Sequence, residues 1–248
     1  MGAETLCVLL GASLGGFVQG LSGFAFGLVA MPIWAWLVAP QLIGPMVVFG
    51  SIMGQLLSLG TVRSGLDWRR IWPFVLGGAI GVPIGVYVLR FLNPIVFKAA
   101  VGCLLSLYCP TLLAVRRLPQ INAGGRPADA AIGWLGGIMG GIGGLTGPVP
   151  VLWCMLRGWR SDTQRAVFQC FNIAMQALAL AIYAGSGMLT GEVGRHFALV
   201  LPAMLLPALL GTRLYRRVDE AAFRRVVLAL LTISGLVLLA VSAPRLLR

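Results

Sequence analysis

Long apolar runs separated by short polar turns occupy most of this chain. Six of the runs have the length of one membrane-spanning helix, and they lie at residues 42–62, 71–91, 95–115, 164–185, 196–215 and 223–243. Two further apolar segments, residues 5–38 and 130–156, are interrupted by glycine-rich stretches. The pattern predicts an all-α polytopic membrane protein.

The first interrupted segment is too long to be one span. A single helix over residues 5–38 would measure roughly 50 Å, against a hydrocarbon core of about 30 Å. Its middle, Gln19–Gly23, contains glycine and polar residues. We expect this stretch to divide the segment into two short helices of about fifteen residues each, folded as a re-entrant hairpin.

The second interrupted segment is richer still in glycine, with eight glycines among the fifteen residues from Gly133 to Gly147. Close packing of helices through small residues explains part of this pattern, as in Gly140-x-x-x-Gly144. It does not explain the prolines at 148 and 150, which interrupt a helix and then allow it to restart. Irregular backbone survives in lipid only where protein buries it or it lines a cavity. We therefore predict a broken, functional helix here, with Thr146 as an N-cap.

The two interrupted segments are copies of each other. At an offset of 121 positions, residues 14–23 align with residues 135–144, and five of the ten pairs are identical. The same offset aligns Ser51 and Gln55 with Asn172 and Gln176, and an offset of 126 aligns Gly85 with Gly211. Internal repeats determine the architecture. We predict two homologous membrane modules, residues 1–118 and 129–248, joined by a cytoplasmic linker at 119–128.

Composition agrees with a membrane protein and makes other classes improbable. Apolar residues form 58% of the chain and charged residues 10%, with a mean hydropathy of +0.92. The net charge of +12 does not indicate nucleic acid, because the basic residues lie in short loops between apolar runs. Five scattered cysteines show no CxxC spacing, so we predict neither a disulfide framework nor a metal or cofactor site.

The distribution of Lys and Arg selects one topology. If each interrupted segment crosses the membrane once, the two sides receive nine and ten basic residues. If each enters and leaves on the same side, one side collects fourteen and the other five. The positive-inside rule favours the second arrangement. It places both termini outside the cytoplasm of a plasma (inner) membrane protein and makes the two modules inverted repeats, a recurring plan of secondary transporters.

This geometry predicts an anion site. The second half-helix of each hairpin begins near mid-membrane, at Ser22-Gly23-Phe24 and Thr146-Gly147-Pro148, and a helix N-terminus attracts anions. Uncharged polar residues in a span are costly unless paired, so they are functional candidates, although hydrogen bonding that only joins helices is the alternative for any one of them. The predicted substrate-binding residues are Gln19, Ser22, Gly23, Ser51, Gln55, Gly144, Thr146, Gly147, Asn172 and Gln176.

Enzyme activity is not predicted. Gly20-Leu21-Ser22-Gly23 matches the GxSG pattern of intramembrane serine proteases, but such a serine needs a histidine base within reach. The sole histidine, His196, falls at the outer end of a span, and the second copy has Gly143 in place of Ser22. No carboxylate is expected in mid-span, since the pattern places Asp129 and other acidic residues in loops.

The chain resembles the TauE/SafE family of sulfite and organosulfur anion exporters and permeases. The resemblance is carried by residues 16–24 (GFVQGLSGF) with Pro32, by 81–85 (GVPIG), and in the second copy by 144–152 (GLTGPVPVL) with Arg157-Gly158 and Arg165. Family members often have a GGPP-like sequence where this chain has Gly147-Pro148-Val149-Pro150. The resemblance implies transport of small sulfur-containing or carboxylated anions.

We therefore expect a transporter that binds a small anion, such as sulfite, another sulfur oxyanion or an organosulfonate, between two helix N-termini with alternating access. A channel-like anion conductor and a non-transporting membrane scaffold or accessory subunit are the alternatives. The expected partners are the anion and the lipid bilayer. Homo-oligomerisation, the direction of transport and any coupling ion are left open by the sequence.

Overall fold

The described part of the chain is helical throughout, as predicted. The structure is a computed structural model, and it describes residues 2–22, 25–58, 67–114, 120–121, 123–214 and 220–246. The described helices are α1 (Ala3–Ser22), α2 (Phe26–Trp34), α3 (Pro40–Ser58), α4 (Trp68–Phe91), α5 (Pro94–Ala114), α6 (Gly125–Gly143), α7 (Pro148–Leu156), α8 (Ser161–Gly185), α9 (Gly191–Leu214) and α10 (Glu220–Leu246).

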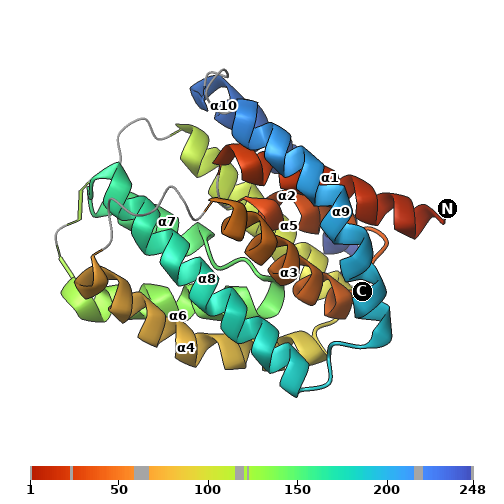
Figure 1. Cartoon of the computed structure of the whole chain (residues 1–248), viewed down its shortest axis with the longest axis horizontal. Helices are drawn as coiled ribbons and strands as arrows, with labels where there is room; N and C mark the ends of the chain where they lie inside the picture. Colours follow the sequence, from red (N-terminus) through yellow and green to blue (C-terminus); the bar gives the residue numbers. More distant parts are fainter. Residues whose placement is uncertain are drawn as a thin grey trace.

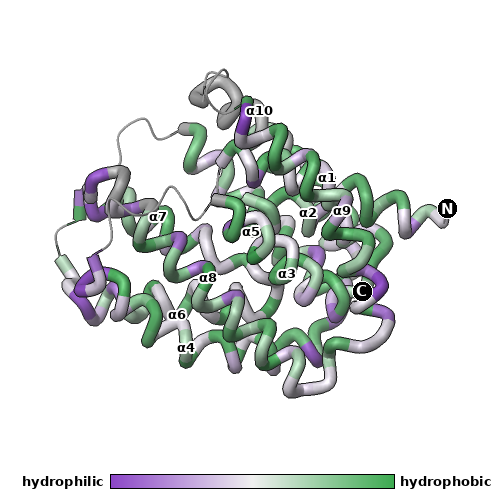
Figure 2. Tube along the Cα trace, in the orientation of Figure 1, coloured by the Kyte–Doolittle hydropathy of each residue, from purple (hydrophilic) through white to green (hydrophobic). Residues whose placement is uncertain are grey.

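Six helices of the described residues are long and apolar enough to cross a membrane: α1, α3, α4, α5, α8 and α9. Among the residues of α10 whose side chains are described, the apolar stretch runs over Leu231–Pro244. Figure 2 shows hydrophobic residues along nearly all the helices, with hydrophilic residues concentrated at their ends. This distribution is the one a bilayer requires, because polar groups at a helix end reach the water.

Both glycine-rich segments are broken, but into unequal parts. α1 has 20 residues and α2 has nine, while α6 has 19 and α7 has nine. The expected pair of fifteen-residue helices in residues 5–38 is therefore wrong. At about 1.5 Å per residue, α1 alone is about 30 Å long, which is the full thickness of a hydrocarbon core.

Each short helix folds back along the longer helix before it. The indole nitrogen of Trp34, at the end of α2, donates to the carbonyl of Val8 in α1, 3.1 Å away. At the opposite end of α2, the Phe26 amide lies beside Gln19 of α1. α2 is thus antiparallel to α1 and ends beside Val8, while α1 extends beyond it toward the N-terminus (Figure 1).

Glycines bring helices of the two halves into backbone contact. A Cβ placed on Gly20 of α1 would lie 2.1 Å from the carbonyl oxygen of Ala208 in α9, and one on Gly141 of α6 would lie 2.3 Å from that of Val82 in α4. No side chain fits at such distances, so only glycine allows these helices to approach. The two contacts correspond to each other, because Gly141 follows Gly20 by 121 positions and Ala208 follows Val82 by 126.

Two hydrophobic clusters lie on either side of α3. One surrounds α2 and includes the fully buried Phe26, Met31 and Trp34. The other surrounds α8 and includes Phe171 and Tyr183. Burial of nearly all of α2 explains how so short a helix is held in place, since a nine-residue helix is not stable alone.

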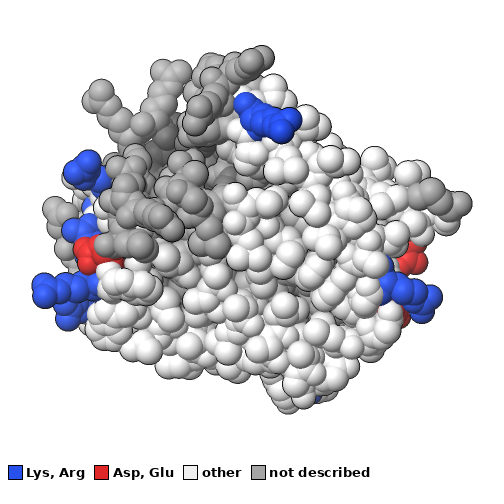
Figure 3. All heavy atoms as spheres, viewed as in Figure 1, with Lys and Arg blue, Asp and Glu red and all other residues white. Residues whose placement is uncertain are grey.

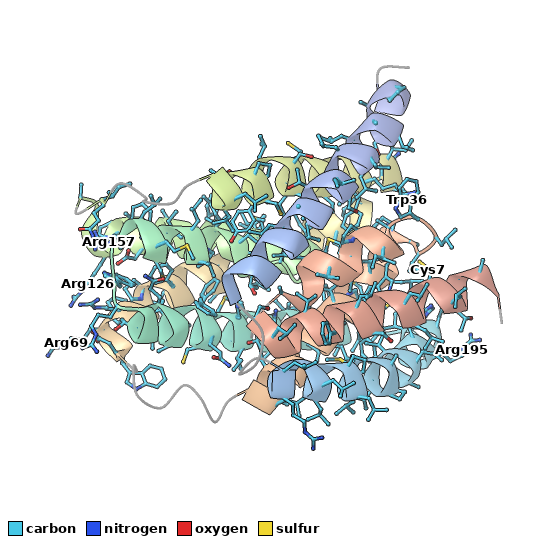
Figure 4. All side chains as sticks on the ribbon, turned by 90° about the horizontal axis from the view of Figure 1, so that it is seen from above. Cys7, Trp36, Arg69, Arg126, Arg157 and Arg195 are labelled. Atoms are coloured by element: carbon cyan, nitrogen blue, oxygen red, sulfur yellow. The ribbon has the colours of Figure 1, made fainter. Side chains whose placement is uncertain are left out.

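Charged residues lie mainly at the two ends of the long axis on the face shown in Figure 3, with a wide uncharged belt between them. Arg69, Arg126 and Arg157 lie at one end, and Arg195 lies at the opposite end, near the N-terminus (Figure 4). The C-terminal end of α10 also lies toward the N-terminal end of the molecule (Figure 1).

Candidate functional site

The two helix breaks lie beside each other. A Cβ placed on Gly27, the second residue of α2, would lie 3.3 Å from Leu145 Cδ2 and 3.9 Å from the carbonyl oxygen of Gly144. Gly144 and Leu145 belong to the break between α6 and α7. Segments 118 positions apart in the sequence are therefore neighbours in the interior.

Gln19 organises the first break. Its Nε2 donates to the carbonyl of Ser51 in α3 (2.9 Å), and its Oε1 accepts from the backbone N–H of Phe26 (3.0 Å). Phe26 is the first residue of α2, so the amide of Gln19 satisfies one of the N–H groups that a helix start leaves unpaired. Gln19 is 2% exposed. Its buried side chain connects α1, α2 and α3, and it fixes the position at which α2 begins.

Ser22 has a local role in the same break. Its hydroxyl donates to the carbonyl of Val18 (2.8 Å) and accepts from the N–H of Ala25 (3.3 Å). The second half-helix begins at Phe26, four residues later than the predicted start at Ser22. Gly23, the third residue predicted at this break, lies outside the described residues.

The second break is made by glycine conformation. Gly144 has a φ of +71°, a left-handed conformation that ends α6, and its N–H donates to the carbonyl of Gly140 (2.7 Å). α7 then starts at Pro148, with Gly147 at the N-cap and no side chain capping it. The prediction that Thr146 is the N-cap is therefore wrong.

Thr146 instead faces α8. Its hydroxyl accepts from Gln176 Nε2 at 3.4 Å, and the same nitrogen lies 3.3 Å from the carbonyl oxygen of Gly144. Its methyl group occupies the space that a side chain at position 140 would need, 2.3 Å from a Cβ placed there. Position 140 corresponds to Gln19 in the first copy. The first break therefore receives its polar side chain from α1, through Gln19, whereas the second break carries its own, Thr146.

Gln55 of α3 and Gln176 of α8 connect the two halves. Gln55 Nε2 donates to Gln176 Oε1 at 2.8 Å, and the two residues are 1% and 3% exposed. Gln176 Nε2 also lies within hydrogen-bond distance of the Gly144 carbonyl at the second break. Gln55 lies one turn along α3 from Ser51, whose backbone carbonyl accepts from Gln19 at the first break. The sequence-predicted polar residues of α3 and α8 therefore lie against both breaks.

Ser51 and Asn172, the remaining predicted residues, are each 2% exposed. Asn172 lies one helical turn from Gln176, so both residues occupy the same face of α8. Among the described residues, the polar side chains buried around the breaks are uncharged amides and hydroxyls, and no Lys or Arg is buried with them. Such a site offers N–H and O–H donors without a fixed charge.

Comparison with known proteins establishes the family of this chain. The family model described as "Sulfite exporter TauE/SafE" matches residues 8–238. This chain belongs to the TauE/SafE family. The resemblance found in the sequence is thereby confirmed, and the protein is a multi-pass membrane transporter of this family and not an enzyme.

Two curated relatives resemble this TauE/SafE member along most of its length. The "Probable sulfite/organosulfonate exporter TauE" of Cupriavidus necator is 26% identical over 258 residues, covering 98% of this chain and 99% of its own. The "Probable inner membrane transporter protein TsaS" of Comamonas testosteroni is 26% identical over 201 residues, covering 78% of this chain and 81% of its own. No solved structure matches the chain.

Two buried polar residues of this TauE/SafE protein were not predicted from the sequence. Gln169 is 5% exposed and continues the polar face of Asn172 and Gln176, a spacing of three and four residues that helical periodicity could have indicated. Asp129, predicted in a loop, is 4% exposed and lies within α6. Asp129 Oδ1 accepts from Trp153 Nε1 (2.7 Å), a contact between helices that no sequence pattern signals.

Proposed function

We propose that this TauE/SafE transporter carries a small anion, sulfite or another sulfur-containing oxyanion or organosulfonate, which binds between the two helix breaks. The observation that carries this proposal is the Gln55–Gln176 hydrogen bond, which joins two buried amides next to the breaks. The name of the Cupriavidus necator relative supports a transported sulfur anion, and that of the Comamonas testosteroni relative supports transport at the inner membrane.

The start of each short helix supplies the attraction for the anion. α2 and α7 both begin at the breaks, and a helix N-terminus carries about half a positive charge. In α7, Pro148 and Pro150 have no N–H, so Val149 supplies the N–H of its first three residues. Only partial charges and uncharged donors surround the anion, so binding is moderate and release stays possible. Uncharged recognition also avoids the several kcal/mol that a buried, unpaired Lys or Arg costs when the site is empty.

We propose further that the two modules, residues 1–118 and 129–248, are interlocked inverted repeats, and that two units, each built from helices of both modules, move relative to each other around this site. The corresponding contacts of Gly20 with Ala208 and of Gly141 with Val82 support the repeat. They also indicate which surfaces move together, because α1 with α9, and α6 with α4, are locked by backbone contact. α3 and α8 meet through side chains, so the rearrangement takes place there.

The charge distribution supports an orientation with both termini outside the cytoplasm. The end that holds Arg69, Arg126 and Arg157 is then cytoplasmic, and Arg195 is outside. Single cysteines at Arg69 and Arg195, in a cysteine-free background, test this with a membrane-impermeant maleimide on intact cells. We expect labelling at position 195 alone, and labelling at 69 alone would reverse the orientation.

Flux measurements in liposomes test the function. Purified protein is reconstituted, and uptake of sulfite, thiosulfate, taurine and sulfoacetate is measured under either membrane potential and with a pH gradient. We expect saturable uptake of at least one anion with counterflow, as alternating access requires. Flux without counterflow that saturates only at high concentration indicates a channel-like conductor. Absence of flux of all four anions favours a scaffold or accessory subunit.

A further inference from the structure

One buried polar atom beside the breaks has no hydrogen-bond partner among the described residues. It is the side-chain oxygen of Asn172, a residue 2% exposed. Asn172 shares a face of α8 with Gln176, and that face meets the second break, because Gln176 Nε2 lies within hydrogen-bond distance of Gly144 and Thr146. An acceptor buried without a donor is destabilising, because it has given up its hydrogen bonds to water. A group that donates to this oxygen when the site is filled would remove that cost.

The two copies differ in the polar groups around this position. In the first copy, Ser51 occupies the position that corresponds to Asn172, and its carbonyl receives the amide of Gln19. In the second copy Gly140 takes the place of Gln19, so the corresponding donor is missing. The methyl group of Thr146 fills the space beside Gly140. The second half of the site therefore lacks an amide equivalent to Gln19, and it carries the amide of Asn172 where the first half has the hydroxyl of Ser51.

We propose that the transported anion itself donates a hydrogen bond to Asn172 Oδ1. This inference rests on the proposed function, and it narrows the substrate to monoanions that carry an O–H or N–H group beside their anionic oxygens. The N–H groups of the breaks hold the anionic oxygens, and Asn172 recognises the donor. Hydrogensulfite and 2-hydroxyalkanesulfonates have this chemistry. A sulfonate with only an alkyl group leaves Asn172 Oδ1 unpaired, and so does a fully deprotonated dianion.

The test compares two monoanions that differ by one hydroxyl, 2-hydroxyethanesulfonate and ethanesulfonate. Their uptake rates at subsaturating concentration are measured in liposomes for the wild type, Asn172→Leu and Asn172→Ala. One hydrogen bond to a buried acceptor is worth about 1.4 kcal/mol, which is about tenfold. We expect the wild type to prefer the hydroxylated anion by about tenfold. Both variants should transport the two anions at similar rates, because they no longer have the acceptor.

Ser106 provides a matched control. Its hydroxyl oxygen is also buried without a partner among the described residues, but it lies on α5 against Gly235 of α10, away from the α3–α8 contact. Ser106→Ala should therefore keep the wild-type preference. Asn172→Ala is the smaller change and serves where Asn172→Leu does not fold.

Three results would overturn the proposal. Equal uptake of the two anions by the wild type would mean that water, and not the substrate, satisfies Asn172. A tenfold preference that persists in the Asn172 variants would assign the donor to another acceptor. If neither these anions nor any of the four used above crosses, the proposed function fails and this inference fails with it, whereas flux without discrimination removes the inference alone.

Discussion

The side-chain amides of Gln55 and Gln176 are hydrogen-bonded to each other at 2.8 Å, although 121 positions separate them in the chain. The same offset aligns the two glycine-rich segments, so each residue contacts its own counterpart. In a structure with approximate two-fold symmetry, this relationship holds only for residues close to the axis. The proposed site and the proposed axis of the repeat thus coincide. A substitution of either glutamine therefore alters contacts of both modules.

Removing either member of this pair should destabilise the protein. Gln55→Ala and Gln176→Ala each remove one side of the buried hydrogen bond between the two amides, which costs about 1–3 kcal/mol. The double variant should lose less than the sum, because neither amide remains. Unfolding midpoints of the three variants in detergent measure this coupling. Strictly additive losses would contradict a direct interaction.

Alanine at Gly20 or Gly141 should disrupt the helix contacts. Each new Cβ would lie within 2.3 Å of a backbone carbonyl oxygen, and backbone cannot move aside as a side chain can. We expect a loss of about 1–3 kcal/mol or more for each. Gly194→Ala is the matched control, since nothing lies within 4 Å of its added Cβ and alanine favours a helix by about 1 kcal/mol. Equal thermal stability of all three variants would contradict the backbone contacts.

Gln19→Glu should separate the structural role of this residue from its electrostatic role. The glutamate can still accept from the Phe26 N–H, but it cannot donate to the Ser51 carbonyl while ionised, and it adds a negative charge beside the proposed anion site. We expect folding to persist and the KM for the anion to rise about tenfold or more.

Gln41→Glu is the control for this charge. Gln41 hydrogen-bonds the carbonyl of Leu92, at the start of α3 and away from the breaks. Its KM should stay near the wild-type value. A KM that is unchanged in Gln19→Glu as well would place the anion elsewhere.

Asp129 should hold the α6–α7 hairpin together at its base. Its carboxylate accepts from Trp153 Nε1 and lies 4.0 Å from Arg157 Nε. Asp129→Asn keeps an acceptor for the indole but loses the ion pair, whereas Asp129→Ala loses both. We expect the alanine variant to be the less stable by about 1–3 kcal/mol, measured by thermal unfolding. The reverse order would contradict a role for the indole hydrogen bond.

Sequence reasoning anticipated the helices and the two breaks, because apolar length, glycine and proline are local signals. It could not anticipate the unequal lengths of α1 and α2, since the run from residue 5 to 38 is apolar on both sides of the break. The partner of Thr146 is Gln176, 30 residues away, so its hydroxyl was assigned to the nearest helix start. The burial of Asp129 depends in the same way on Trp153 of another helix.

Saturable sulfite uptake into liposomes by the wild type and by the Gln55→Ala/Gln176→Ala double variant tests the central claim most directly. The double variant is first shown to be folded and reconstituted in equal amount. The account predicts that uptake saturates in the wild type and is reduced at least tenfold in the double variant. Wild-type uptake that the double variant retains would contradict an anion site at the Gln55–Gln176 pair.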